Sequence, residues 1–135
     1  MTTSANQCVS YSQYGFMDLK SAYLSKDSEL RLFLDKHDIH IDLEAQILTY
    51  NGQYYDISYG PRPRGDKDAV NCWSVGRKFF YDYTICGFLS VWESAPYGGQ
   101  VHRRPEILDD IDNLLHLRLS REWERTHIPY EITAK

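Results

Sequence analysis

The dipeptide Asn51-Gly52 constrains the fold of this chain more than any other feature, because it stands between two runs of strand-forming residues. Asn-Gly in this setting is typical of a two-residue type I′ turn, whose central residues both need a positive φ. Such a turn fixes the pairing, with Tyr50 opposite Gln53 and Leu48 opposite Tyr55. Because side chains alternate along a strand, one face of the hairpin then carries Leu48, Tyr50, Tyr55, Ile57 and Tyr59.

The residues before the hairpin predict two short helices and one more strand. Apolar residues recur at helical spacing in Phe16–Leu24. Asp27 or Ser28 is suited to cap a second helix, which ends near Lys36-His37, where a cation complements the helix C-terminus. From Ile39 onward, apolar and polar residues alternate, and this period of two predicts a strand.

The segment 60–66 contains two glycines and two prolines and is expected to be a loop, since neither a helix nor a strand accommodates that density. Beyond it, Cys72–Val75 is predicted as a short strand and Gly76-Arg77 as a turn. Residues 78–92 then alternate over a long distance, with aromatic and β-branched side chains on one face. This pattern predicts a long strand.

The segment 105–125 carries the clearest helix pattern in the chain. Pro105 and the acids after it fit a helix N-terminus, and an apolar stripe comprises Ile107, Leu108, Ile111, Leu114, Leu115 and Leu119. We therefore predict a two-layer α+β domain. Its antiparallel sheet has four to five strands, with short N-terminal helices and a C-terminal amphipathic helix packed on one face. Residues 1–13 are expected to be a loose N-terminal arm and residues 14–135 a single domain.

The net charge of −4 is unevenly distributed along the chain. Residues 61–104 carry seven Lys or Arg and four Asp or Glu, whereas the segments on both sides are acidic. Nucleic-acid binding usually needs a broad basic face, so this pattern argues against it. It favours a local site for an acidic partner or a small anion.

The composition also indicates a cellular compartment. The polar start lacks the apolar run of a signal peptide, and no stretch approaches the roughly 20 apolar residues of a membrane span. The three cysteines, Cys8, Cys72 and Cys86, form no CxxC pair, so neither a disulfide framework nor a zinc site is expected. We expect a cytoplasmic protein without cofactor or metal, since no phosphate loop or dinucleotide fingerprint occurs.

Basic and aromatic residues gather in the middle of the sequence. Arginine, tyrosine and tryptophan are the residues enriched at the hot spots of protein interfaces. The predicted partner-binding surface therefore comprises Tyr54, Arg62, Arg64, Lys67, Trp73, Arg77 and Lys78. The tripeptide Arg64-Gly65-Asp66 matches an adhesion motif, but three-residue matches arise by chance and it adds nothing to this prediction.

A second loop, residues 94–104, leads into the predicted C-terminal helix and offers an alternative. Guanidiniums beside a helix N-terminus can hold a phosphate or carboxylate. A small phosphorylated ligand or signalling nucleotide would then be bound by Tyr97, His102, Arg103 and Arg104. A second alternative is a cysteine hydrolase that uses Cys72 and His102, although no nucleophile signature surrounds Cys72.

In size, acidity, tyrosine content and lack of a catalytic signature, the chain resembles the small intracellular inhibitors of bacteria and phages. These include toxin-immunity and anti-defence proteins, and the likeness rests on general character rather than on a motif. It implies a protein-binding module that inhibits a partner protein. This is the first function that we predict, and it needs no catalytic residue.

Overall fold

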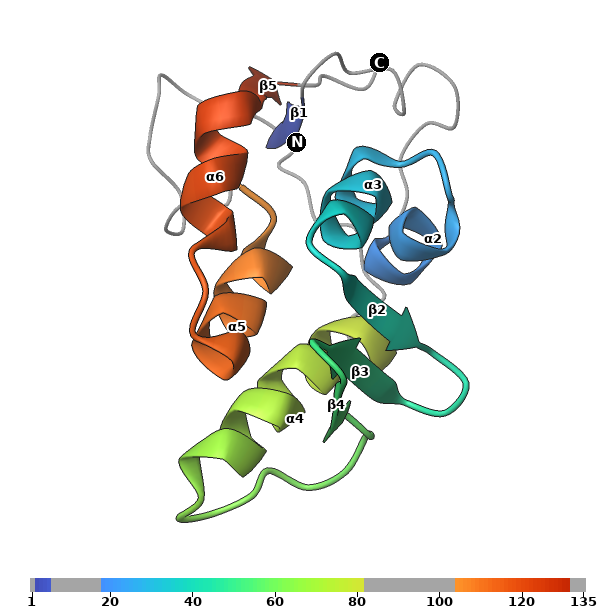
Figure 1. Cartoon of the computed structure of the whole chain (residues 1–135), viewed down its shortest axis with the longest axis vertical. Coiled ribbons are helices and arrows are strands. Elements are labelled where there is room, and N and C mark those ends of the chain that lie inside the picture. Colours follow the sequence, from blue (N-terminus) through green and yellow to red (C-terminus); the bar gives the residue numbers. More distant parts are fainter. Residues whose placement is uncertain (1, 6–17, 82–103, 132–135) are drawn as a thin grey trace, which may run out of the picture.

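The fold is known from a computed structural model, which describes residues 2–5, 18–81 and 104–131. The elements in chain order are β1 (Thr2–Ala5), α2 (Leu19–Leu24), α3 (Glu29–Lys36), β2 (Ile39–Asp42), β3 (Ile47–Tyr50), β4 (Gln53–Asp56), α4 (Lys67–Phe80), α5 (Glu106–Leu115), α6 (Leu119–Thr126) and β5 (Ile128–Glu131). The chain therefore combines helices with an antiparallel sheet, which confirms the predicted α+β class (Figure 1). None of the described helices is both long and apolar enough to cross a bilayer.

The central sheet is antiparallel, with strand order β2-β3-β4. Asn51 and Gly52 have φ angles of 51° and 77°, the positive values that a type I′ turn requires. Tyr50 pairs with Gln53 and Leu48 with Tyr55, so the predicted register is confirmed. The main-chain N–H of Ile57 extends the ladder by donating to the carbonyl of Gln46 over 3.0 Å.

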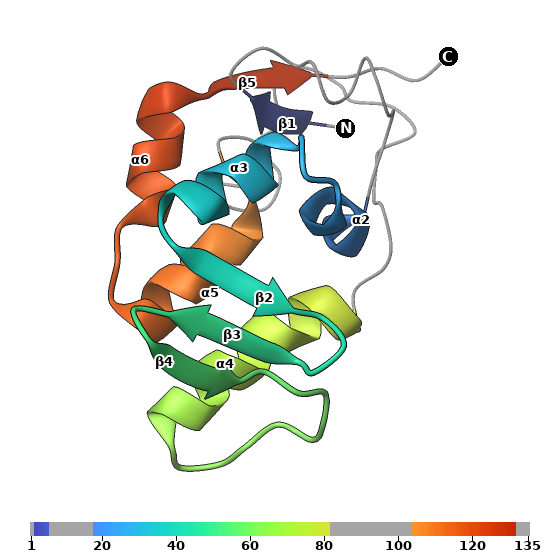
Figure 2. The same ribbon diagram turned by 45° about the vertical axis from the view of Figure 1, so that its right-hand side comes forward.

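Helices cover one face of this sheet, as Figure 2 shows for α4 and α5. The inward side chains of β2 and β3, Ile39, Ile41 and Leu48, are buried, whereas His40 and Asp42 on the opposite face are exposed. The core continues between the helices through Leu34, Val75, Phe79, Leu108, Ile111 and Trp123. The sheet is thus apolar on one side and open on the other, which is typical of a two-layer antiparallel domain.

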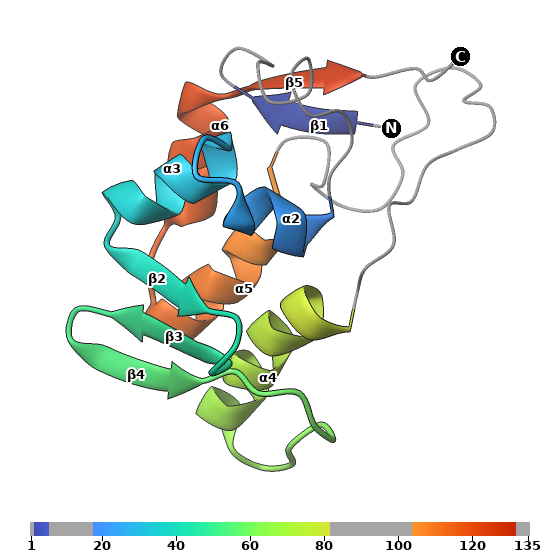
Figure 3. The same ribbon diagram turned by 90° about the vertical axis from the view of Figure 1, so that its right-hand side faces the viewer.

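The two N-terminal helices follow the sequence prediction closely. Asp18 caps α2 by accepting a hydrogen bond from the N–H of Ser21, and Ser28 caps α3 by accepting from the N–H of Arg31. Helix α3 ends at Lys36, and His37 is its C-cap. Both helices lie beside β2, away from β4 (Figures 1 and 3).

The prediction for residues 72–81 was wrong. Cys72–Val75 is not a strand and Gly76-Arg77 is not a turn, because both lie inside the 14-residue helix α4. The residues buried along α4, Val75 and Phe79, are four positions apart, which is a helical spacing. The remainder of the predicted strand, residues 82–92, lies outside the described residues.

The predicted number of strands is not confirmed. The described part of the central sheet has three strands. A separate antiparallel pair joins β1 to β5, with Thr2 opposite Glu131 and Ala5 opposite Ile128. Strand β1 lies within the segment predicted as a loose arm, and residues 6–13 of that segment are outside the described part.

The predicted C-terminal helix is divided into α5 and α6. His116 ends α5 in the left-handed conformation, with φ 56°. The side chain of Asp112, within α5, contacts the first residues of α6. Its carboxylate accepts hydrogen bonds from the N–H of Leu119 over 2.7 Å, and from the N–H and hydroxyl of Ser120. A carboxylate suits the positive end of a helix, so this contact fixes the corner.

Candidate functional site

A surface pocket of about 450 Å³ lies between α4 and the loop that follows β4. We call it the Trp73 pocket. Its described lining consists of Ser58, Tyr59, Gly60, Pro61, Arg62, Trp73, Arg77 and Tyr81. The pocket therefore combines aromatic rings and guanidiniums, and no carboxylate is among its described residues.

Helical spacing places three of the lining residues together. Trp73, Arg77 and Tyr81 are four residues apart along α4 and its C-cap, so they share one side of the helix. The N-cap of the helix is Asp66, whose side chain accepts hydrogen bonds from the N–H groups of Asp68 and Ala69. The last residue of the Arg-Gly-Asp tripeptide is therefore a helix cap.

The indole of Trp73 is held in place by the loop. Its Nε1–H donates to the carbonyl of Gly60 over 2.9 Å. This bond joins the loop to α4 and satisfies the only polar atom of the indole. Trp73 is thus positioned before any ligand arrives, and its ring remains half-exposed.

Two guanidiniums lie against this indole. The Cζ atom of Arg62 is 5.7 Å from the ring centroid and that of Arg77 is 5.6 Å away, within the range of a cation–π contact. Both side chains are exposed, and neither forms an ion pair with a described residue. Two positive charges without a direct ion-pair partner among the described residues therefore stand at one pocket.

A pair of tyrosines completes the pocket. The rings of Tyr59 and Tyr81 stack with centroids 5.8 Å apart and an angle of 10° between their planes. They are 61% and 56% exposed, so their outer surfaces remain available. Sequence reasoning missed both residues as site members. A helical interpretation of the segment after residue 66 would have placed Tyr81 beside Arg77.

The other predicted partner-binding residues occupy different positions. Arg64 and Lys67 are exposed in the loop and first turn of α4 but do not line the pocket. Tyr54 is 76% exposed on the solvent face of β4. Lys78 points away, because its Nζ atom lies 2.6 Å from the carboxylate of Glu106 on α5. The structure thus brings Arg62, Trp73 and Arg77 together and separates Lys78 from them.

The alternative anion site can be described only in part. Tyr97, His102 and Arg103 lie outside the described residues. Arg104 donates to Asp109 over 2.9 Å and also pairs with Glu124 of α6. Its guanidinium therefore joins α5 to α6 and is already neutralised by two carboxylates.

Cys72, the nucleophile of the hydrolase alternative, lies within α4 and is half-buried. Burial raises the pKa of its thiol, and the nearby charges of Asp56, Asp68 and Asp66 act in the same direction. Raising the pKa favours the thiol over the nucleophilic thiolate at neutral pH. His102 is outside the described residues. In the part that is described, no three side chains are grouped as metal ligands.

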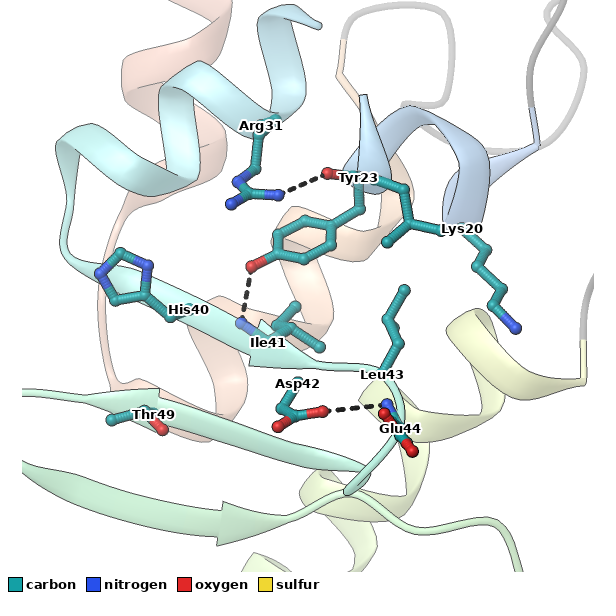
Figure 4. A pocket seen from close by; sticks show the side chains of 10 residues that line it. Lys20, Tyr23, Arg31, His40, Ile41, Asp42, Leu43, Glu44 and Thr49 are labelled. Carbon is teal, nitrogen blue, oxygen red and sulfur yellow. Dashed lines mark hydrogen bonds between the residues drawn. The ribbon is translucent and has the colours of Figure 1, made fainter. Parts of the chain in front are cut away.

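A second pocket, of about 750 Å³, lies where α2 and α3 meet β2 (Figure 4). The hydroxyl of Tyr23 accepts a 2.6 Å hydrogen bond from the N–H of Ile41, and Arg31 donates to the carbonyl of Tyr23 over 3.0 Å. Arg31 also pairs with Asp35. The polar groups of Tyr23 and Arg31 are therefore already bonded within the protein.

No family model, curated protein or solved structure matches the chain.

Proposed function

We propose that this chain is a cytoplasmic protein-binding module that inhibits a partner protein by covering one of its surfaces, in the manner of immunity or anti-defence proteins. Its contact surface is the Trp73 pocket with the flanking Arg64, Lys67 and Tyr54. The observation that carries the proposal is the pair of guanidiniums, Arg62 and Arg77, held against one indole without a carboxylate partner in the described part.

The chemistry of the pocket supports an acidic partner. Tryptophan, tyrosine and arginine dominate interface hot spots because they bury large areas and form directional hydrogen bonds. Arg62 and Arg77 already rest on Trp73, so less side-chain entropy is lost when a carboxylate binds them. The overall charge of −4 would repel most acidic proteins, and a local basic site therefore selects one with a matching acidic patch.

Partner capture tests this proposal directly. The tagged protein is used to isolate binding proteins from a lysate of its source organism, and the recovered protein is then titrated as a pure component. Changing both Arg62→Glu and Arg77→Glu should weaken its binding by more than about 100-fold, since each lost charged contact is worth at least ~1.4 kcal/mol.

A double variant on the far helix gives the matched control. Arg118, the N-cap of α6, and Arg121 within α6 are exposed and form no ion pair with any residue that the structure describes. Replacing both with Glu changes the net charge by the same amount and should leave binding intact. Equal loss in both double variants, or full binding by the Arg62/Arg77 variant, would reject this surface.

A further inference from the structure

The available polar groups of the Trp73 pocket are mainly hydrogen-bond donors. They are the two guanidiniums and the hydroxyls of Ser58, Tyr59 and Tyr81, none of which is hydrogen-bonded to another described side chain. The indole N–H is already occupied by Gly60. Such a set matches an anion with several acceptor oxygens. A phosphate offers three terminal oxygens and nearly two charges, and therefore uses these donors more fully than a carboxylate.

The stacked tyrosines add a second requirement. Tyr59 and Tyr81 lie in the same pocket as the guanidiniums and present exposed aromatic surface. A flat ring on the ligand would stack on this pair, an interaction worth about 1–3 kcal/mol per nucleobase in other proteins. The volume of about 450 Å³ falls within the roughly 300–1,000 Å³ that small-molecule sites occupy. A ligand that carries both a phosphate and an aromatic ring would therefore use both parts of the pocket.

We propose that the Trp73 pocket binds a nucleoside 5′-monophosphate. Arg62 and Arg77 hold the phosphate, and the base stacks on the Tyr59–Tyr81 pair. This site is distinct from the alternative predicted from the sequence around Arg104, whose guanidinium is already paired with two carboxylates. The inference does not depend on a protein partner, because it concerns the free protein.

Isothermal titration of the purified full chain with AMP, GMP, CMP and UMP tests this site. At least one nucleotide should bind with a dissociation constant below about 1 mM. It should bind at least about tenfold more tightly than either the matching nucleoside or inorganic phosphate, the ratio expected when one charged or stacking contact is missing. If none of the four binds, or if inorganic phosphate binds equally well, the proposal is wrong.

Two neighbouring residues of α4 provide a matched pair of variants. Arg77→Gln removes a pocket guanidinium, whereas Lys78→Gln removes the same charge from a side chain that is turned toward Glu106. Arg77→Gln should weaken nucleotide binding about tenfold or more, and Lys78→Gln should leave it within about twofold. Tyr81→Leu should weaken binding of the nucleotide more than binding of inorganic phosphate. Equal effects of Arg77→Gln and Lys78→Gln would show that only the overall charge matters, and would overturn the assignment.

A third comparison identifies the source of the nucleotide. A short 5′-phosphorylated oligonucleotide carries the same terminal group as a free mononucleotide. Tighter binding of the oligonucleotide supports the site with a strand end as its ligand, and equal or weaker binding supports it with the free nucleotide. A phosphotyrosine peptide that binds more tightly than every nucleotide would overturn the proposal. None of these outcomes bears on partner capture, which is measured without added nucleotide.

Discussion

Among the glycines that the structure describes, Gly76 is the one where an added methyl group should disturb the fold most. It is buried in the third turn of α4, where the helix crosses the end of β4. A Cβ atom added at this position would lie 1.9 Å from the carbonyl oxygen of Ile57 and 2.8 Å from its carbonyl carbon. Both atoms belong to the backbone, so no side-chain rotation can relieve the contact.

The size of the effect follows from two opposing terms. Ordinary contact begins at 3.4 Å, so the helix and strand would have to separate by about 1.5 Å. Overpacking of a core costs roughly 1–3 kcal/mol, and a backbone shift of this size belongs at the upper end of that range. Alanine gains about 1 kcal/mol over glycine in a helix. Gly76→Ala should therefore destabilise the protein by about 2 kcal/mol, which lowers Tm by roughly 8 °C in a chain of this length.

Urea unfolding followed by circular dichroism measures this change, and Gly60→Ala is the matched control. Gly60 has no atom within 4 Å of an added Cβ and no positive φ, so its substitution should change the free energy of unfolding by no more than about 0.5 kcal/mol. If Gly76→Ala is neutral or stabilising, helix propensity alone decides the outcome. The close crossing of α4 over Ile57 would then be refuted.

Three further predictions concern single contacts. Tyr23→Phe keeps the ring but leaves the buried N–H of Ile41 without an acceptor, so urea unfolding should show a loss of about 1–3 kcal/mol, and the exposed Tyr54→Phe none. Asp112→Ala removes the contact that starts α6 and should cost about 2 kcal/mol in the same assay; an unchanged midpoint would contradict the capping role. Burial lowers the pKa of His127, so its contribution to stability is complete above its ordinary pKa near 6.5 and is lost as the pH falls through the lowered value. The fall in stability between neutral and acidic pH should therefore be smaller in His127→Gln than in the parent protein, and identical pH profiles would exclude this role.

The sequence was sufficient where local chemistry decides the structure. A type I′ turn needs positive φ angles at both central residues, and Asn51 and Gly52 adopt them. Ser28 carries a hydroxyl directly before an apolar helical repeat, and the structure uses it as the cap of α3. In both cases the signal lies within a few residues and does not depend on the rest of the fold.

The sequence misled where two periodicities overlap. Phe79 and Tyr81 belong to an alternating pattern that continues to residue 92, and this favoured a strand. Phe79 also lies four residues after Val75, which is the helical spacing that the core selects. The cap at Asp66 was the missing local signal, since it directly precedes the first turn of α4.

This error also concealed much of the site. Arg62, Trp73 and Arg77 were predicted for one surface from their residue types alone. A strand at residues 72–75 followed by a turn gives no reason for Trp73 and Arg77 to lie one helical turn apart. The indole–carbonyl bond to Gly60, which holds the loop against α4, depends on tertiary packing and has no signature in the sequence.

The hydrogen bond between Tyr23 and Ile41 makes the two edges of the central sheet unequal as sites where a further strand could pair. It occupies an outward main-chain N–H of β2, and α2 and α3 lie along that edge. At β4 the register turns the main-chain groups of Tyr54 and Asp56 outward, and no described strand pairs with them. Unpaired edges are templates for incoming strands. Main-chain association is therefore directed to β4, the strand that leads into the Trp73 pocket.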